Sequence, residues 1–280
     1  MTAVWPAPVA IPSATAEPRG ATVLGALLEQ RTGQRIAENR SWRIDTALKP
    51  LLSALSLDRV EQLTALLRGG RDTALADQIV DLLLNQETSF FRDVGMIEAA
   101  ATAARAAEER NGMAARIWCA ACATGQEPLS LAMLFAEDGA PPPPILATDV
   151  SIAAITRARR ATYNQFEIQR GLPIRRMMRW FASADEQQWA ASSRLLETIS
   201  YRRHNLVADP APVGTFDLIL CRNVLFYLVP ERREQVLDRL AGALAPGGLL
   251  LLGAGETVIG QTERLRPSTR LRGFYEVVPA

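Results

Sequence analysis

The chain of 280 residues is poor in three residue types that often carry chemistry. It has one histidine, His204, and one lysine, Lys49, so arginine supplies every other side-chain cation. It has three cysteines, Cys119, Cys122 and Cys221, an odd and low count that argues against a disulfide framework and fits a reducing cytoplasm. No run reaches the roughly 18 apolar residues of a membrane helix, so direct membrane insertion is not expected.

The chain also lacks an excess of charge of either sign. Its net charge is +1, so no global field attracts nucleic acid or a membrane surface, and we expect neither as a partner. Residues 1–20 have no cationic start and no unbroken apolar stretch, because Pro6, Pro8 and Pro12 interrupt them. They predict a flexible tail rather than a signal peptide.

The stretch from Arg116 to Pro128 is the one around which the chain is organised. Residues 117–121 form a short stretch of apolar and small side chains, as in a buried strand of a parallel sheet. Thr124-Gly125 supplies a sharp turn, and Glu127-Pro128 opens a helix, with proline in the first turn where a missing N–H costs nothing. Strand, glycine turn and helix together predict the first unit of a nucleotide-type α/β sheet.

A second short apolar strand, residues 145–148, ends in Asp149, which lies 24 residues after Gly125. An acid about 20 residues past a glycine turn, at a strand end, is placed to bind ribose hydroxyls. Gly125 is the only glycine of this turn, so no glycine pair lets a pyrophosphate approach, and a dinucleotide is not favoured. A single-nucleoside cofactor without phosphates fits better, and S-adenosylmethionine is the obvious one.

The region before this unit, residues 22–84, is predicted to be wholly helical, as a bundle of about four helices. Ser41 is expected to cap the second helix, and Asp58 with Glu61 resembles a capping box at the start of the third. The second helix carries an apolar stripe of Ile44, Leu48, Leu51, Leu52 and Leu55.

Later segments continue the sheet. Residues 216–221 predict a central strand, and Arg222-Asn223 follows at its C-terminal end, where open α/β sheets bind ligands. A helix is expected from Pro230, and residues 249–252 and 273–278 predict further strands.

The connection over residues 163–203 is too long for a plain link. We interpret it as an insertion with a helix at 175–181 and an antiparallel hairpin, whose strand at 195–201 leads back into the sheet. The expected organisation is a tail over 1–20, a helical domain over 21–84 and an α/β domain over 85–280.

Three separated motifs carry a family resemblance. They are Glu87-Thr-Ser-Phe-Phe-Arg-Asp93, Ala121-Cys-Ala-Thr-Gly-Gln-Glu-Pro128 and Phe216-Asp-Leu-Ile-Leu-Cys-Arg-Asn-Val-Leu-Phe-Tyr227. In this order they resemble the CheR-type chemotaxis receptor (protein-glutamate) O-methyltransferases, from about Thr22 to about Glu256. The resemblance implies a Rossmann-like methyltransferase sheet, S-adenosylmethionine as donor, and glutamates on the cytoplasmic helices of chemotaxis receptors as acceptors. We expect a cytoplasmic monomer.

The resemblance also implies which residues form the site. The cofactor-binding candidates are Gln86, Thr88, Arg92, Glu127, Asp149, Asn205, Leu206, Arg222 and Asn223. Glu127 would hold the amino group of the cofactor and Asp149 its ribose. The catalytic candidates are Arg92, which would orient the acceptor carboxylate as a guanidinium fork, and Tyr227, which would flank the transferring methyl. The chain departs from the family pattern at Gln86, where the family has asparagine, and in the turn Gly253–Glu256. No metal is expected.

The cysteines allow two other interpretations. Trp118-Cys-Ala-Ala-Cys122 is similar to a thioredoxin active site, but Thr124-Gly125 separates its second cysteine from the helix. On a strand, an offset of three also points the two side chains to opposite faces. A zinc site could combine the three cysteines with His204, although a second C-x-x-C pair is missing. Small buried packing is the usual role of such cysteines.

Three further alternatives stay open at the level of sequence. Asn205 could simply terminate a strand, and Tyr227 could pack in the core at the start of a helix. The whole fold could also serve as a non-catalytic signalling scaffold.

Overall fold

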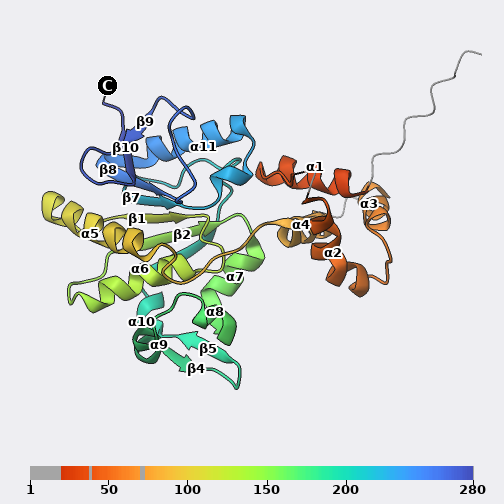
Figure 1. The fold of residues 1–280 in the computed structure, drawn as a ribbon, viewed down its shortest axis with the longest axis horizontal. Coiled ribbons are helices and arrows are strands. Elements are labelled where there is room, and N and C mark those ends of the chain that lie inside the picture. The colour runs from red at the N-terminus through yellow and green to blue at the C-terminus, as the bar shows by residue number, and fades with distance from the viewer. Residues whose placement is uncertain (1–19, 38–39, 70–72, 280) are drawn as a thin grey trace, which may run out of the picture.

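The chain folds into a group of four N-terminal helices beside a mostly parallel sheet with helices on both faces (Figure 1). The computed structural model describes residues 20–37, 40–69 and 73–279. The tail predicted over residues 1–20 therefore lies outside the described residues except for Gly20, which begins the first helix.

The four N-terminal helices enclose an apolar core of their own. They are α1 (Gly20–Thr32), α2 (Trp42–Ala54), α3 (Val60–Gly69) and α4 (Thr73–Leu83). Leu24, Leu48, Leu63 and Ile79 come from one helix each, are fully buried and belong to one cluster. Leu55 does not extend the stripe of α2 as predicted, because it lies past the helix end and is 42% exposed.

Two predicted helix caps in this region are wrong. Ser41 precedes α2, but its side chain makes no capping hydrogen bond. Ahead of α3, the backbone N–H of Asp58 donates to Oε1 of Gln62 at 2.7 Å, and no capping box joins Asp58 to Glu61. The Gln62 side chain thus accepts the N–H of Asp58, which the glutamate of a capping box would otherwise accept.

Seven strands form the main sheet, in the order β6-β2-β1-β7-β8-β10-β9. They are β1 (Ile117–Ala120), β2 (Ile145–Asp149), β6 (Ile199–Arg203), β7 (Phe216–Cys221), β8 (Leu244–Leu252), β9 (Leu265–Pro267) and β10 (Phe274–Val277). Strands β6, β2, β1, β7 and β8 run parallel, whereas β10 is antiparallel to β8 and β9. In the centre, Ile117 of β1 lies opposite Ile145 of β2 and Leu218 of β7. The carboxyl ends of these three strands therefore meet at one edge of the sheet, as predicted for a Rossmann-like fold.

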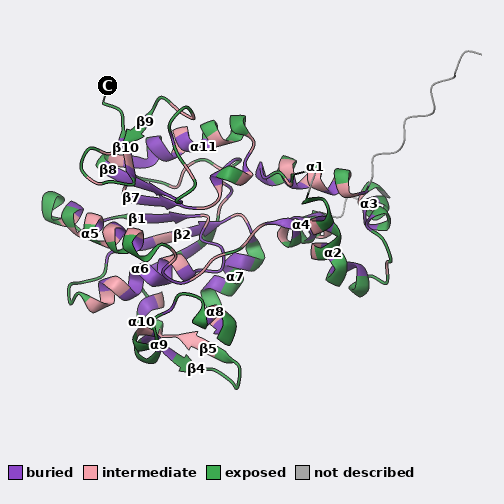
Figure 2. Cartoon of the chain, viewed as in Figure 1, coloured by how far each residue is buried: buried purple, intermediate pink, exposed green. Residues whose placement is uncertain are grey.

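Helices cover both faces of the sheet, and the strands between them are buried (Figure 2). One face packs against α5 (Val94–Asn111), α6 (Gln126–Glu137) and α7 (Ile152–Arg160), and the other against α11 (Pro230–Ala243). Alternation along β1 sends Cys119 into the first cluster and Trp118 into the second. Within the described residues, none of the helices has the length and apolar character needed to span a membrane.

The insertion lies between α7 and β6. It consists of β3 (Thr162–Asn164), α8 (Gln165–Gln169), α9 (Ile174–Trp180), β4 (Phe181–Ser183), β5 (Gln188–Ala191) and α10 (Ser193–Leu196). The predicted hairpin exists as β4 and β5, which with β3 form a separate antiparallel sheet. The predicted strand at 195–201 is right only in its second half: Leu195 is buried in α10, whereas residues 199–201 belong to β6, which pairs in parallel with β2 at the edge of the main sheet. Apolar alternation alone does not separate the end of a short helix from the start of a strand.

The insertion is fastened to the segment that precedes α5. Arg170 forms an ion pair with Glu87. The ring of Phe90 packs edge-on against Tyr163 with centroids 5.1 Å apart. Gly171 has a positive φ of 94°, and a Cβ there would overlap the carbonyl oxygen of Phe90. Glycine is thus required at this contact by both conformation and space.

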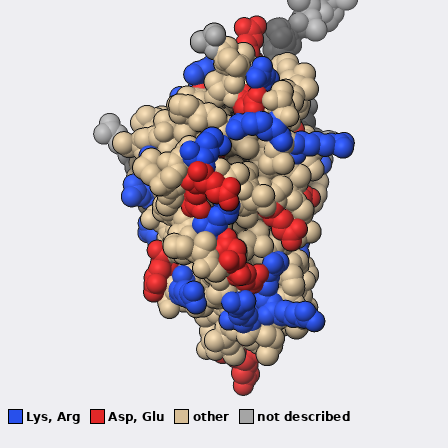
Figure 3. All heavy atoms as spheres, turned by 90° about the vertical axis from the view of Figure 1, so that its left-hand side faces the viewer, with Lys and Arg blue, Asp and Glu red and all other residues tan. Residues whose placement is uncertain are grey.

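Surface charge is mixed on the face farthest from the N-terminal helices (Figure 3). Acidic and basic side chains are interspersed there, which agrees with the net charge of +1. Such mixing leaves no continuous field of one sign on that face.

Candidate active site

The glycine turn joins β1 to α6 through an unusual backbone. Ala121, Ala123 and Gly125 all have positive φ, at 63°, 48° and 93°. Residues other than glycine rarely adopt this region, and nothing in the sequence predicted it for the two alanines. A Cβ at Gly125 would lie 3.0 Å from the hydroxyl of Tyr201, so the side chains beneath the turn also leave little room.

Asp149, at the end of β2, braces this turn. Its Oδ2 accepts a hydrogen bond from the backbone N–H of Ala123, and its Oδ1 accepts one from Ser151, both at 2.9 Å. Burial raises the pKa of Asp149 above its ordinary value, and the two backbone donors act against that rise. The predicted ribose acceptor is therefore also a structural brace between two strand ends.

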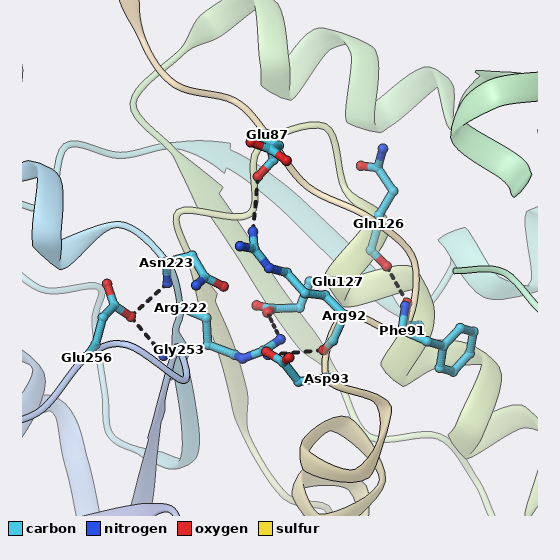
Figure 4. Close-up of polar contacts among 11 residues, drawn as sticks. Glu87, Phe91, Arg92, Asp93, Gln126, Glu127, Arg222, Asn223, Gly253 and Glu256 are labelled. Carbon is cyan, nitrogen blue, oxygen red and sulfur yellow. Dashed lines mark hydrogen bonds and ion pairs between the residues drawn. The ribbon is translucent and has the colours of Figure 1, made fainter. Parts of the chain in front are cut away.

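Arg222, at the end of β7, is a buried cross-link (Figure 4). Its side chain is 2% exposed and donates to the Glu127 carboxylate at 3.0 Å, to the carbonyl of Arg92 at 3.0 Å and to the Asp93 carboxylate at 2.5 Å. Burial raises the pKa of Glu127, and the neighbouring Arg222 guanidinium lowers it. Arg222 therefore joins three segments, while its Nε is buried without a protein partner.

Glu256, which the sequence did not point to as a site residue, holds the segment after Arg222. One carboxylate oxygen accepts the backbone N–H groups of Asn223 at 2.7 Å and Gly253 at 2.8 Å. The other accepts those of Val224 at 2.9 Å and Leu225 at 2.7 Å. Because all four partners are main-chain groups, no pattern of side chains could have shown them in advance.

Asn205 connects the sheet to the N-terminal helices. Its Oδ1 accepts from the backbone N–H groups of Val207 at 2.9 Å and Ala208 at 3.3 Å, and its Nδ2 donates to the carbonyl of Arg31 at 2.7 Å. The side chain is thus engaged by protein partners, while the residue itself lines the cavity described below together with Leu206.

The segment before α5 carries Arg92 and contacts the other catalytic candidate, Tyr227, through Asn85. Gln86 donates to the hydroxyl of Ser151 at 3.1 Å. Arg92 is partly exposed, and within the described residues its guanidinium forms no ion pair; its contact is the carbonyl of Glu87 at 3.4 Å. Tyr227 comes from the short helix Leu225–Tyr227, and its hydroxyl accepts a close hydrogen bond from the amide of Asn85. Asn85, next to Gln86, was not among the predicted site residues.

All nine cofactor-binding candidates line one cavity at the carboxyl edge of the sheet. They are Gln86, Thr88, Arg92, Glu127, Asp149, Asn205, Leu206, Arg222 and Asn223. Tyr227 is not part of this lining, but its partner Asn85 is. The lining also includes Thr32 and Gln34, so the end of the first helical segment closes one wall.

The cysteines are buried packing residues. Burial raises the pKa of Cys119 and of Cys122 well above the ordinary value, which keeps both thiols protonated and unreactive. Both belong to the same core cluster, so the predicted divergence is wrong; Cys122 lies beyond the end of β1, where strand alternation no longer applies. Across the described residues, no group of three or more His, Cys, Asp and Glu side chains is placed to hold a metal ion.

Known proteins are similar to this chain in sequence. A protein-family model described as "CheR methyltransferase, SAM binding domain" matches residues 86–273. A chemotaxis protein methyltransferase of Vibrio parahaemolyticus is 32% identical over 243 residues, which cover 85% of this chain and 88% of that one. The chemotaxis protein methyltransferase Cher2 of Pseudomonas putida is 31% identical, with 83% and 88% covered. Among solved structures, the N-methyltransferase NodS of Bradyrhizobium japonicum WM9 in complex with S-adenosyl-L-homocysteine is 24% identical over 55% of this chain and 59% of that chain. Its TM-score of 0.32 is too low to carry an argument.

The matched region extends from Gln86 to the loop before β10 and so contains every cofactor-binding candidate. The family model spans more than half of the chain, and both relatives exceed 30% identity over most of their length. The chain therefore belongs to the CheR methyltransferase family, and its cofactor is S-adenosylmethionine.

Proposed function

We propose that this chain transfers a methyl group from S-adenosylmethionine to glutamate side chains of chemotaxis receptors and so forms glutamyl methyl esters. The relatives' names, chemotaxis protein methyltransferase, support the chemotaxis setting. The observation that carries the proposal is Arg92: it lines the cofactor cavity and, among the described residues, its guanidinium forms no direct ion pair. Glu87 and Glu127 interact with it only at longer range, so the guanidinium can still bind an incoming carboxylate in a fork.

The cavity lining fits the cofactor. Asn223 has a buried Oδ1 and Arg222 a buried Nε that lack partners within the protein, and a bound polar molecule would satisfy them. Glu127 and Asp149 supply carboxylates, which suit the amino group and the ribose hydroxyls. The bound cofactor would supply an electrophilic methyl group on a sulfonium.

The residues of the chain then orient the acceptor and exclude water from the transferring group. A free glutamate has a pKa of about 4.3 and is already an anion near neutral pH, so no general base is needed. Arg92 would orient the acceptor carboxylate so that one oxygen faces the methyl group at near contact distance. Tyr227, held through its hydroxyl by Asn85, would flank the transferring group and help to exclude water.

We further propose that the acceptors are glutamates on the cytoplasmic helices of the receptors and that the chain acts on them as a cytoplasmic monomer. Helical glutamates are negatively charged, which is complementary to the positive charge of Arg92. The cavity is also bordered by the N-terminal helical segment through Thr32 and Gln34, a position from which a partner helix could approach.

The test is methyl transfer from labelled S-adenosylmethionine to receptor-containing membranes, scored as methanol released by alkali. We expect Arg92→Ala to lower turnover strongly while the affinity for S-adenosylhomocysteine stays near that of the wild type. Arg272→Ala, an exposed arginine on the far loop, is the matched control and should keep full turnover. No alkali-labile label with the wild type would contradict the function. If Arg92→Ala instead loses much of its cofactor affinity but keeps normal turnover, Arg92 binds the cofactor rather than the acceptor.

A further inference from the structure

Glu256 is the most densely hydrogen-bonded carboxylate beside the cavity, yet it does not line the cavity. It follows β8, and its two oxygens accept four backbone N–H groups at 2.7–2.9 Å (Figure 4). Three of these groups belong to consecutive residues, Asn223 to Leu225, directly after the buried cross-link Arg222. A carboxylate that accepts several backbone donors is a strong local constraint.

The segment that Glu256 holds needs such a constraint. Asn223 has a φ of 59°, and a residue other than glycine held in this region costs on the order of 1–3 kcal/mol unless its surroundings impose it. The fit is also tight, because a Cβ at Gly253 would lie 2.6 Å from Nδ2 of Asn223. The buried Oδ1 of Asn223 meanwhile has no protein partner. The strained conformation of Asn223 therefore sets the direction of its unpaired acceptor, Oδ1. The Glu256 carboxylate fixes that conformation by accepting backbone hydrogen bonds.

The same segment leads to the acceptor side of the site. Leu225, whose N–H donates to Glu256, begins the short helix Leu225–Tyr227, and the hydroxyl of Tyr227 meets Asn85. One carboxylate thus sets the start of a helix that carries a catalytic candidate, as well as the conformation of a cofactor-binding candidate.

We propose that Glu256 is a positioning residue for methyl transfer: without touching either substrate, it holds Asn223 toward the cofactor and Tyr227 toward the acceptor. This inference rests on the proposed cofactor-binding role of Asn223.

The test compares Glu256→Gln with wild type by calorimetric titration of S-adenosylhomocysteine. Each carboxylate oxygen accepts two N–H groups, so a glutamine in either orientation sets its own NH2 against two backbone donors. We expect the affinity to fall about tenfold or more, as for the loss of charge-assisted hydrogen bonds. Glu263→Gln, an exposed glutamate in the following loop, is the matched control and should bind like the wild type.

A double-mutant cycle with Asn223→Ala separates positioning from general destabilisation. If Glu256 acts through Asn223, then Glu256→Gln should cost much less affinity in the Asn223→Ala background than in the wild type. Equal losses in the two backgrounds, or wild-type affinity in folded Glu256→Gln, would overturn the inference.

If Glu256→Gln does not fold, Glu256→Asp replaces it, because aspartate keeps both oxygens on a shorter side chain. A folded Glu256→Asp is expected to bind several-fold more weakly, and wild-type affinity there would contradict the inference. Failure of the wild type itself to bind S-adenosylhomocysteine would instead defeat the proposed function.

Discussion

Replacing Arg222 with methionine should produce a large and specific loss of stability. The Arg222 side chain is 2% exposed and the Glu127 side chain 13%, and they are joined at 3.0 Å. Methionine retains much of the length of arginine but leaves the Glu127 carboxylate buried and unpaired, which costs about 3–5 kcal/mol. For a chain of this size, 1 kcal/mol shifts the melting temperature by about 2–4 °C, so we expect a fall of about 6–20 °C. The side chain of Asp93, the second ion-pair partner of Arg222, is 41% exposed, so loss of this ion pair adds little to the loss of stability.

The assay is urea unfolding of the cofactor-free protein as a function of pH. Burial already raises the folded-state pKa of Glu127, and removal of Arg222 takes away a group that lowers it. In the window above the ordinary glutamate pKa of about 4.3, the folded state then holds a proton that the unfolded state has lost. The unfolding free energy of Arg222→Met should therefore rise as the pH falls through that window, and more steeply than that of the wild type.

Glu127→Gln in the Arg222→Met background is the decisive comparison. It removes the buried charge and should recover part of the lost stability, whereas Arg272→Met should change the unfolding free energy by less than about 0.5 kcal/mol. A loss below about 1 kcal/mol in Arg222→Met, or no recovery in the double variant, would refute the view of Arg222 as the counter-charge of a buried carboxylate.

Three further predictions concern the cofactor, the cysteines and the receptor. Asp149→Ala should weaken S-adenosylhomocysteine binding by about 1–3 kcal/mol in calorimetry; wild-type affinity would remove it from the cofactor site. Cys119→Ser with Cys122→Ser should retain methyl transfer with lower stability, because the new hydroxyls are buried; insulin reduction by the wild type that the double variant loses would instead show redox chemistry. On α2, where Lys49 is exposed and Arg43 partly so, charge reversal of both should raise the Michaelis constant for receptor without changing cofactor affinity. The effect should shrink when salt reduces the screening length below about 8 Å, and identical constants at low salt would contradict it.

The sequence could predict that the site candidates lie near one another because parallel strands bring their carboxyl ends together. Asp149 was found from its distance to a glycine turn and its place at a strand end, Arg222 from its place after an apolar strand, and Glu127 from the family resemblance. The structure gathers all of them around one cavity. Such local signals depend on side-chain type and on periodicity, which can be read directly along the chain.

What the sequence could not predict depends on contacts between backbone and distant side chains. Glu256 lies more than 30 positions from Asn223, and its partners are N–H groups that every residue other than proline carries. The left-handed conformations of Ala121 and Ala123 likewise leave no compositional trace. The predicted strand at 195–201 began too early, because alternation of side chains does not show that Leu195 belongs to the short helix α10.

The contact between Gly171 and Phe90 has a consequence for exchanging parts between relatives. The carbonyl of Phe90 occupies the space in which any other residue at position 171 would place its Cβ. Arg170 and Tyr163 hold the same segment through Glu87 and the ring of Phe90. Consider a chimera that receives the insertion of a relative but keeps its native residues 87–90. The foreign insertion would then pack against residues that did not evolve with it, close to Arg92. The insertion and this segment are therefore one transplantable module, although more than 70 residues of chain separate their facing parts.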